Sequence, residues 1–178
     1  MKYKVEIESL GAMLQHRFSE DILTTPSKKS KDKKLTEKEK RAIAEQYLYL
    51  EKGKPCVPAN HLEGAMQKAS TNFKFQGKTS YKEIIKGATF VFPEYIPIKA
   101  KGWEVDSRAI VNPSTRGRSM CYRPRFEKWS LGFTIEVNDD RADGEVVRQI
   151  LEHAGLYKSI GAYRPRFGRF VVKKFKKA

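Results

Sequence analysis

A run of alternating apolar side chains constrains the fold more than any other feature of this sequence. Apolar residues occupy every second position from Trp129 to Val137, and the run ends at the turn-forming sequence Asn138-Asp139-Asp140. Side chains of a β-strand point to opposite faces with a period of two, so this pattern is typical of a strand with one buried face. Such a strand needs a sheet around it and a second layer against its apolar face.

Five other segments can be placed around this strand. The alternation of Tyr3, Val5 and Ile7 predicts an N-terminal strand, and Asp143 can cap an amphipathic helix. After the N-terminal strand, the predicted order is helix at 60–70, strand at 88–92, strand at 129–137, helix at 144–154 and strand at 168–175. This split βαβ order predicts a single α+β domain over residues 1–178. We expect a ferredoxin-like (RRM-like) βαββαβ antiparallel sheet with both helices on one face.

Two basic insertions interrupt this order. The first, residues 20–56, is a lysine-rich loop followed by a helix. Thr36 and Glu39 form a capping box at the start of that helix, which is predicted to run to about Lys52. The second insertion, residues 99–128, is rich in arginine and is predicted to be irregular. Both insertions add positive charge outside the predicted core.

The chain carries a large positive charge. It has 36 Lys and Arg residues against 21 Asp and Glu residues, a formal net charge of +15 on 20.5 kDa. Such a charge attracts polyanions, of which nucleic acid is the commonest in a cell. A membrane surface would favour a basic helix with a large apolar face, and the sequence shows no clear one. Docking on an acidic protein is the other explanation of the charge.

Cysteine content and hydrophobicity exclude several classes of protein. Cys56 and Cys121 are too few for a disulfide framework or a zinc site. No apolar run reaches the ~18–20 residues that a membrane span needs, and the N-terminus lacks the apolar stretch of a signal peptide. The sequence therefore predicts a cytoplasmic protein with no membrane attachment, no metal ion and no cofactor.

The pentapeptide Tyr-Arg-Pro-Arg-Phe occurs twice, at residues 122–126 and 163–167, in surroundings that do not otherwise repeat. Arginine interleaved with aromatic rings is a composition that can grip a phosphate backbone and stack on bases. The alternative is structural, with Phe126 and Phe167 in the core and guanidinium groups packed on aromatic faces. We expect the phenylalanines to be structural and the arginines to bind nucleic acid.

Candidate binding residues come from three regions. The second pentapeptide lies in a Gly-rich loop, where glycine permits close approach of the backbone to an anion. A lysine-rich segment in the first insertion is either a solvated linker or a loop that binds phosphates. The candidates for phosphate contact are Arg123, Arg125, Arg164, Arg166, Arg169, Lys28, Lys29, Lys31, Lys33 and Lys34. The candidates for base stacking are Tyr122, Tyr163 and Trp103, and those for backbone approach are Gly161 and Gly168.

Two motifs resemble the RAMP superfamily of CRISPR-associated proteins. One is the Gly-rich basic loop of residues 161–170, just before the last strand. The other is the segment 57–66, which is similar to the family's IPGSSLKGAL helix entry, although residues 59–63 read Ala-Asn-His-Leu-Glu, a weaker setting for an anion. The resemblance implies ferredoxin-like domains and RNA binding along the sheet and the Gly-rich loop. It also implies assembly into a multi-subunit filament, and a phage or mobile-element relative of the family fits equally.

The histidines raise the question of catalysis. Processing endoribonucleases of the RAMP superfamily often use a histidine in this region as a general base, and His16 follows the first predicted strand with Arg17 beside it. Cutting RNA without a metal ion needs a base, a proton donor and a cation for the phosphorane. His16, Arg17 and a nearby tyrosine could supply these groups. We nevertheless expect a binding protein rather than an enzyme.

The sequence thus predicts a protein that binds single-stranded RNA or DNA, with RNA favoured. As the resemblance implies, it would act as a homo-oligomer or as a subunit of a CRISPR-type or phage-encoded ribonucleoprotein in antiviral defence. One alternative is a metal-independent RNA-processing endoribonuclease. The other is an interaction protein that docks on, or mimics, a subunit of a guide-RNA complex.

Overall fold

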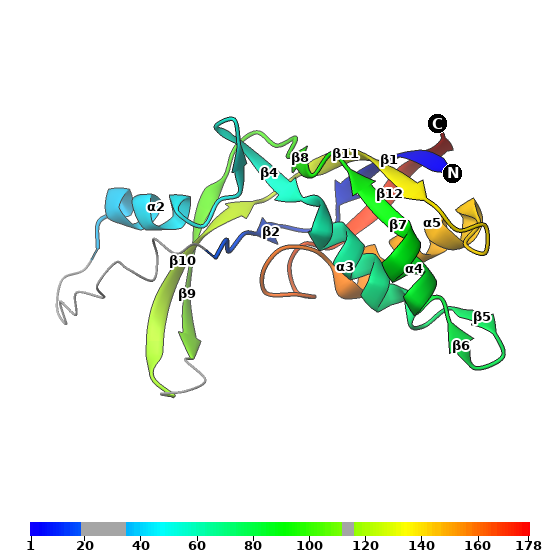
Figure 1. Ribbon diagram of the computed structural model, residues 1–178. Coiled ribbons are helices and arrows are strands. Elements are labelled where there is room, and N and C mark those ends of the chain that lie inside the picture. Colours follow the sequence, from blue (N-terminus) through cyan, green and yellow to red (C-terminus); the bar gives the residue numbers. More distant parts are fainter. Residues whose placement is uncertain (19–34, 112–115) are drawn as a thin grey trace.

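A four-stranded sheet lies at the centre of the computed structural model, which describes residues 1–18, 35–111 and 116–178 (Figure 1). Its strands, in spatial order, are β12 (Phe170–Lys177), β1 (Lys2–Ser9), β11 (Ser130–Val137) and β7 (Thr89–Phe92). All neighbouring strands are antiparallel. The predicted alternation is confirmed, because Val5, Phe133 and Ile135 are buried while Lys4 and Glu6 are exposed.

Two helices cover the buried face of this sheet. Helix α3 (Ala59–Ser70) packs against β7, helix α5 (Gly144–His153) packs against β12, and the two helices contact each other. Their fully buried side chains share one core with β1 and β11, and they include Leu62, Met66, Ile150 and Leu151. A shorter helix, α4 (Lys82–Ala88), precedes β7 and packs on α3. The predicted α+β architecture with antiparallel strands is therefore confirmed.

Helix α5 begins where the sequence predicts, and a π-helical turn follows it past the predicted end of the helix. The Asp143 side chain accepts a hydrogen bond from the backbone N–H of Val146 at 2.9 Å, as an N-cap does. Gly155, which was expected to end the helix, lies instead in a π-helical turn, η1 (Ala154–Lys158). A Cβ on Gly155 would collide with the backbone of Phe170, so this glycine allows β12 to pack closely against the turn.

The helix of the first insertion is shorter than predicted. Helix α2 (Glu37–Glu45) has the predicted capping box, but it does not run to Lys52. The chain forms strands β3 (Leu50–Glu51) and β4 (Lys54–Pro58) around a turn in which Lys52 and Gly53 have positive φ angles. Gly53 tolerates this left-handed conformation, and β4 then pairs with β8 (Tyr95–Pro97). The pairing partner of β4 is distant in sequence, so helical spacing alone gave the wrong prediction.

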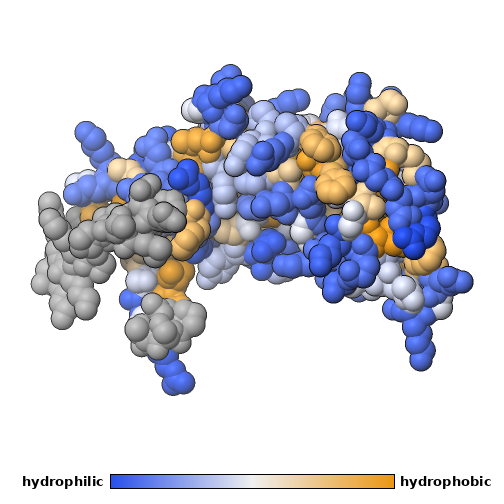
Figure 2. Space-filling view, in the orientation of Figure 1, coloured by the Kyte–Doolittle hydropathy of each residue, from blue (hydrophilic) through white to orange (hydrophobic). Residues whose placement is uncertain are grey.

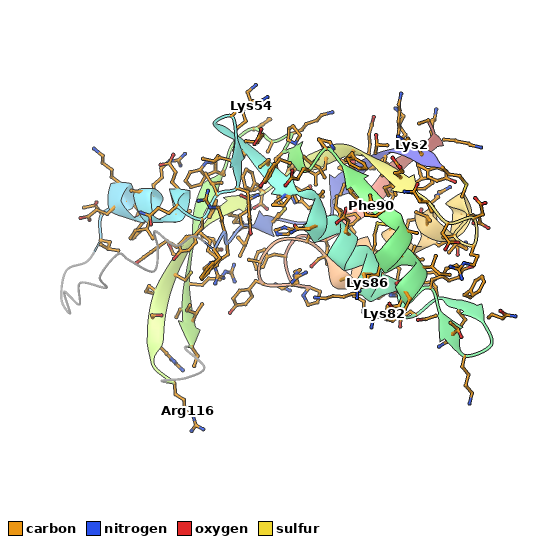
Figure 3. The ribbon with its side chains drawn as sticks, viewed as in Figure 1. Lys2, Lys54, Lys82, Lys86, Phe90 and Arg116 are labelled. Atoms are coloured by element: carbon orange, nitrogen blue, oxygen red, sulfur yellow. The ribbon has the colours of Figure 1, made fainter. Side chains whose placement is uncertain are left out.

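The second insertion is a long hairpin, so the prediction of an irregular segment was wrong. Strands β9 (Glu104–Val111) and β10 (Arg118–Phe126) pair over their whole length, and the base of β10 also pairs with β2 (Met13–Leu14). The outer half of the hairpin projects from the body of the molecule, with Arg116 at its tip (Figures 1 and 3). Both faces of that half are exposed, so its strands need no apolar alternation.

The remaining elements complete a mostly hydrophilic surface. A small hairpin of β5 (Lys74–Gln76) and β6 (Thr79–Ser80) connects α3 to α4. In Figure 2 the apolar residues form small, separate patches among hydrophilic ones. Of the helices in the described residues, none is long and apolar enough to cross a membrane.

Candidate nucleic-acid interface

The two copies of the pentapeptide meet at strand β2. On one side β2 pairs with β10, which carries the first copy, and Arg125 lies opposite Leu14. On the other side Ala162, next to the second copy, forms an isolated bridge to Leu14 and donates its N–H to the Leu14 carbonyl at 2.8 Å. Segments that are far apart in the sequence are therefore neighbours in space. We call the region around β2 that carries Arg123, Arg125, Tyr163, Arg164 and Arg166 the β2 surface; Phe126 and Phe167 are buried beneath it.

Arg123, from the first copy, places a positive charge in the interior of the β2 surface. This residue is only 8% exposed, and its Nε donates to His16 Nδ1 at 2.9 Å. The Nη1 atom is buried and has no hydrogen-bond partner among the described residues, and no described carboxylate forms an ion pair with Arg123. Burial of a charge without a counter-ion is unfavourable, so this guanidinium lacks the anion that usually accompanies it.

Tyr163, from the second copy, connects the two copies through its ring. The Arg123 guanidinium lies 5.5 Å from the ring centroid and that of Arg108 lies 5.9 Å from it. The Arg108 guanidinium also lies 4.5 Å from the centroid of Phe167, which is buried as expected. The structural alternative for the repeat, guanidinium groups on aromatic faces, therefore holds for Arg123, and Arg108, from outside the repeat, packs on the same group of rings.

Arg108 and Tyr47 are residues of the β2 surface that the sequence-based prediction missed. Arg108 is held by Asp106 through Nε at 2.6 Å and Nη2 at 2.9 Å. The spacing of Asp106 and Arg108 could have identified this pair in the sequence, because residues two apart lie on one face of a strand. Tyr47 was missed because the predicted helix included it, whereas it follows the end of α2. The alternation of Tyr47 and Tyr49 in the sequence could have indicated an extended segment there.

Three further arginines of the prediction are exposed at the edge of this surface. Arg164, Arg166 and Arg169 are accessible to solvent, and within the described ranges no carboxylate pairs with them. Arg125 differs from them, because its Nη2 forms an ion pair with Glu127 at 2.6 Å and its Nε is buried. The exposed arginines can thus meet a polyanion without first breaking an ion pair in the described part of the chain.

His16 accepts a hydrogen bond at this position. Partial desolvation of its ring and, to a smaller extent, the charge of Arg123 lower the pKa of His16 below its ordinary value. Because an arginine Nε always carries hydrogen, the His16 Nδ1 atom must accept, and the ring proton therefore resides on Nε2. The ring stacks on Tyr47, with centroids 4.4 Å apart, and Arg17 donates its backbone N–H to the Tyr47 carbonyl at 3.0 Å. The Nδ1 lone pair, which a general base would use, is thus occupied by Arg123.

The two motifs that resemble the RAMP superfamily lie near each other. Burial, followed by the charge of Arg164, lowers the pKa of His61 at the start of α3. Arg164 belongs to the Gly-rich loop and His61 to the helix-entry motif, so the loop lies within electrostatic reach of that helix entry. The edge of His61 also meets the ring of Tyr49, with centroids 5.2 Å apart.

Other predicted residues have less access to a ligand or lie outside the described ranges. The Trp103 ring is covered on one face by the Arg41 guanidinium, whose carbon lies 4.1 Å from the ring centroid. Tyr122 is half-buried in β10. The lysines of the first insertion, Lys28, Lys29, Lys31, Lys33 and Lys34, fall outside the residues that the structure describes.

Gly161 and Gly168 have a packing role in the loop. Both have positive φ angles, and a Cβ on Gly161 would collide with the Leu14 carbonyl oxygen. A Cβ on Gly168 would collide in the same way with the Ile160 carbonyl oxygen. These glycines let the loop fold tightly against β2, and their predicted contact with an anion stays a prediction.

The open face of the four-stranded sheet is less suited to nucleic acid than the β2 surface. Three of its cations are paired with carboxylates of neighbouring strands: Lys2 with Glu136 at 2.9 Å, Lys173 with Glu8 at 3.1 Å and Lys174 with Glu6 at 3.1 Å. The exposed residues of β1 on this face are Lys2, Lys4, Glu6 and Glu8, and the aromatic rings of the face, Phe90 and Phe92, lie on the edge strand β7. Binding along the sheet, which the RAMP resemblance implies, would require these ion pairs to open.

Metal and thiol chemistry find no support in the described part of the chain. No group of three or more His, Cys, Asp or Glu side chains there could hold a metal ion. Cys56 and Cys121 are free and buried, and burial raises the pKa of both thiols.

Comparison with known proteins finds similarity at the level of the fold. No protein-family model and no curated protein matches this sequence. A chain in the cryo-EM structure of the Type III-B Cmr-beta bound to cognate target RNA has a similar structure, with a TM-score of 0.59 and 12% sequence identity. The match covers 98% of this chain and 60% of that chain, so this protein spans less than two thirds of its length. This chain therefore shares its fold with that chain of the Type III-B Cmr-beta.

Proposed function

We propose that this protein binds single-stranded RNA through the β2 surface, as a subunit of a CRISPR-type or phage-encoded ribonucleoprotein. The observation that carries the proposal is Arg123, a buried guanidinium with an unpartnered Nη1 and no carboxylate partner among the described residues. Phosphate groups bound at the exposed arginines of the repeat would bring negative charge toward Arg123, whose own Nη1 is buried. The second copy of the repeat adds the exposed Arg164 and Arg166 to the same surface. Guanidinium groups bind phosphate strongly because they donate two parallel hydrogen bonds.

The fold supports the same proposal. The four strands of the central sheet are the four that the sequence predicts for the core, and along the chain they are β1, β7, β11 and β12. In space their order is β12, β1, β11, β7, which is fourth, first, third, second. We infer that this unit is ferredoxin-like and that the chain is a member of the RAMP superfamily. The structural similarity to a chain of the Type III-B Cmr-beta, which was determined with its target RNA, adds support.

The test is a measurement of fluorescence anisotropy with labelled 30-nucleotide single-stranded RNA and the matching DNA over a series of salt concentrations. We expect tight, salt-dependent binding that is stronger for RNA. The double variant Arg164→Ala with Arg166→Ala should bind more than about tenfold more weakly. The slope of log affinity against log salt should become shallower by about 0.7 for each phosphate that the variant no longer neutralises.

A matched control separates specific contacts from total charge. The variant Lys82→Ala with Lys86→Ala removes the same charge from α4, which lies away from the β2 surface (Figure 3). Its affinity should stay close to that of the wild type. Equal decreases in affinity for both double variants, or an unchanged affinity for the arginine variant, would contradict the assignment of the β2 surface.

A metal-independent endoribonuclease is the second candidate, because His16 lies against Tyr47 and Arg123. This function requires Arg123 to release Nδ1 so that the imidazole can accept a proton from the attacking 2′-hydroxyl. A denaturing gel of the RNA after incubation in EDTA tests it. Intact RNA supports the binding function, whereas cleavage that is abolished in His16→Ala supports the nuclease.

A further inference from the structure

A groove beside strand β7 combines aromatic rings with hydrogen-bonding side chains. It has a volume of about 660 Å³ and reaches from the start of α3 to β3 and β8. The rings of Phe90, Phe92 and Tyr95 line it and are exposed by 39–50%. Phe90 is labelled on β7 in Figure 3. Exposed rings of this kind can stack on the bases of a single-stranded nucleic acid.

Two side chains of α3 present hydrogen-bonding groups to this groove. Asn60 and Glu63 both line it, and residues three apart in a helix are neighbours on its surface. The half-buried Glu63 carboxylate is held in place, because its Oε1 accepts a hydrogen bond from the Val91 N–H at 2.9 Å. Among the described residues, its Oε2 has no hydrogen bond and no ion pair. The groove therefore contains a positioned acceptor with one oxygen that is available to a ligand.

The groove is rich in hydrogen-bond acceptors although the chain has a net charge of +15. Glu51 and Glu94 line it together with Glu63, against a single cation, Arg17. Carboxylates repel a phosphate backbone, and they accept hydrogen bonds from N–H groups. A neutral base that carries donors therefore suits the groove better than a phosphate does. Guanine suits it best, because its N1–H and its N2 amino group can donate together to one carboxylate, whereas uracil offers only N3–H.

The groove adjoins the β2 surface. Arg17 lines the groove and directly follows His16, which is hydrogen-bonded within the β2 surface. Tyr49 also lines the groove, and its ring meets the edge of His61, with centroids 5.2 Å apart. Arg164 of the β2 surface lies within electrostatic reach of His61. This continuity favours a base of a bound RNA over a basic peptide, which the charge of the groove would also suit.

We propose that this groove is a base-reading pocket, in which a guanine of the single-stranded RNA stacks on Phe90 and donates from N1 and N2 to Glu63. Asn60 completes the recognition, since its amide N–H₂ donates to the guanine O6. The inference rests on the proposed function, because the β2 surface holds the RNA backbone that delivers the base. It adds a base preference, which contacts to phosphate alone do not give.

Short RNAs that differ in one repeated base test the pocket. Twelve-nucleotide RNAs are built from repeats of UUG, of UUU, or of UU followed by inosine, which lacks the N2 amino group of guanine. In fluorescence anisotropy we expect the UUG repeat to bind about fivefold or more tightly than the UUU repeat, with the inosine repeat between them.

A conservative variant of Glu63 separates base reading from folding. In Glu63→Gln the amide oxygen still accepts from the Val91 N–H, while an N–H₂ group takes the place of the second oxygen. This variant should lose the preference for UUG and keep its affinity for UUU nearly unchanged. Glu83→Gln makes the same change on α4, outside the groove, and should keep the preference. Circular dichroism checks that each variant is folded.

Saturation-transfer NMR with guanosine and uridine tests the pocket without an RNA backbone. We expect transfer to guanosine and much less to uridine, and Phe90→Leu, which keeps apolar bulk but removes the ring, should weaken the transfer to guanosine. A protein that binds guanosine but none of the RNAs would support the pocket and contradict the proposed function. Equal binding of the three RNAs would do the reverse. A groove that binds a peptide of alternating lysine and phenylalanine, and neither nucleoside, would also overturn the pocket.

Discussion

Arg123 and Arg164 occupy the same position of the repeated pentapeptide, yet their surroundings differ. Arg123 is buried in β10, where it contacts His16 and the ring of Tyr163. Arg164 lies in a loop and is exposed. Identical residue types in an identical local sequence therefore take different roles. The pairing of β10 with β9 and β2 buries one of them, and no comparable strand pairing encloses the other.

The two arginines should consequently differ in their effect on stability. We expect Arg123→Ala to lower the free energy of unfolding by about 1–3 kcal/mol, because it removes the His16 hydrogen bond and the packing on Tyr163. Arg164→Ala should change it by less than about 0.5 kcal/mol, since the side chain is exposed. Urea denaturation followed by tryptophan fluorescence measures both values. Equal effects of the two substitutions would contradict the burial of Arg123.

At the scale of elements, the β9–β10 hairpin separates into two halves. Its base carries Asp106, Arg108 and Arg123 and packs against β2 and the loop, whereas its outer half is exposed, with Met120 at 54% and Val111 at 59%. The outer half thus contributes little to the core. Its two arginines, Arg116 and Arg118, are exposed, and Arg116 projects away from the body of the molecule (Figure 3). Both can extend the β2 surface.

Removal of the outer half should therefore affect binding but not folding. Ala109 and Met120 are paired residues, so replacing residues 110–119 by Asn-Gly joins them through a two-residue turn. We expect the melting temperature to change little. The slope of log affinity against log salt for RNA binding should become shallower by about 1.4, which corresponds to two phosphate contacts. Thermal denaturation and anisotropy measure these quantities. A large decrease in thermal stability would show that the outer half supports the core.

At the scale of the whole molecule, electrostatic repulsion and the desolvation of histidines both lower the stability of the fold at low pH. The net charge of +15 destabilises a compact chain through self-repulsion. Burial is the largest cause that lowers the pKa of His16, of His61 and of His153, so the folded chain resists protonation of all three. The unfolded chain, with ordinary histidine pKa values near ~6.5, binds these protons more readily.

Stability should therefore decrease as the pH falls. Since the unfolded state holds more protons between the lowered folded pKa values and ~6.5, the free energy of unfolding rises with pH in that window and is fully restored above it. Urea denaturation at constant ionic strength between about pH 5 and pH 8 measures the slope. The double variant His16→Gln with His61→Gln should have a smaller slope of the free energy of unfolding against pH, because it lacks two of the three histidines. A stability that increases toward low pH would contradict the sign of these shifts.

Local sequence determined the elements whose stabilising contacts are short in range. The alternation in β1 and β11 identifies both strands, because half of each strand's side chains enter one core. The capping residues Thr36 and Asp143 mark the starts of α2 and α5, since a cap acts within three residues. The repeated pentapeptide also identified the segments that form the β2 surface, because arginines interleaved with aromatic rings are visible in the sequence itself.

Tertiary structure alone decided what those segments do together. The hairpin β9–β10 and strands β3 and β4 are held by backbone pairing, which leaves little apolar pattern in the sequence. Strands β10 and β4 pair in addition with the distant strands β2 and β8. Strand β2 has only two residues, yet it brings the two pentapeptide copies together. The burial of Arg123 arises from the pairing of β10 with β9 and β2. Residue types are encoded locally, whereas their neighbours depend on pairings between distant segments.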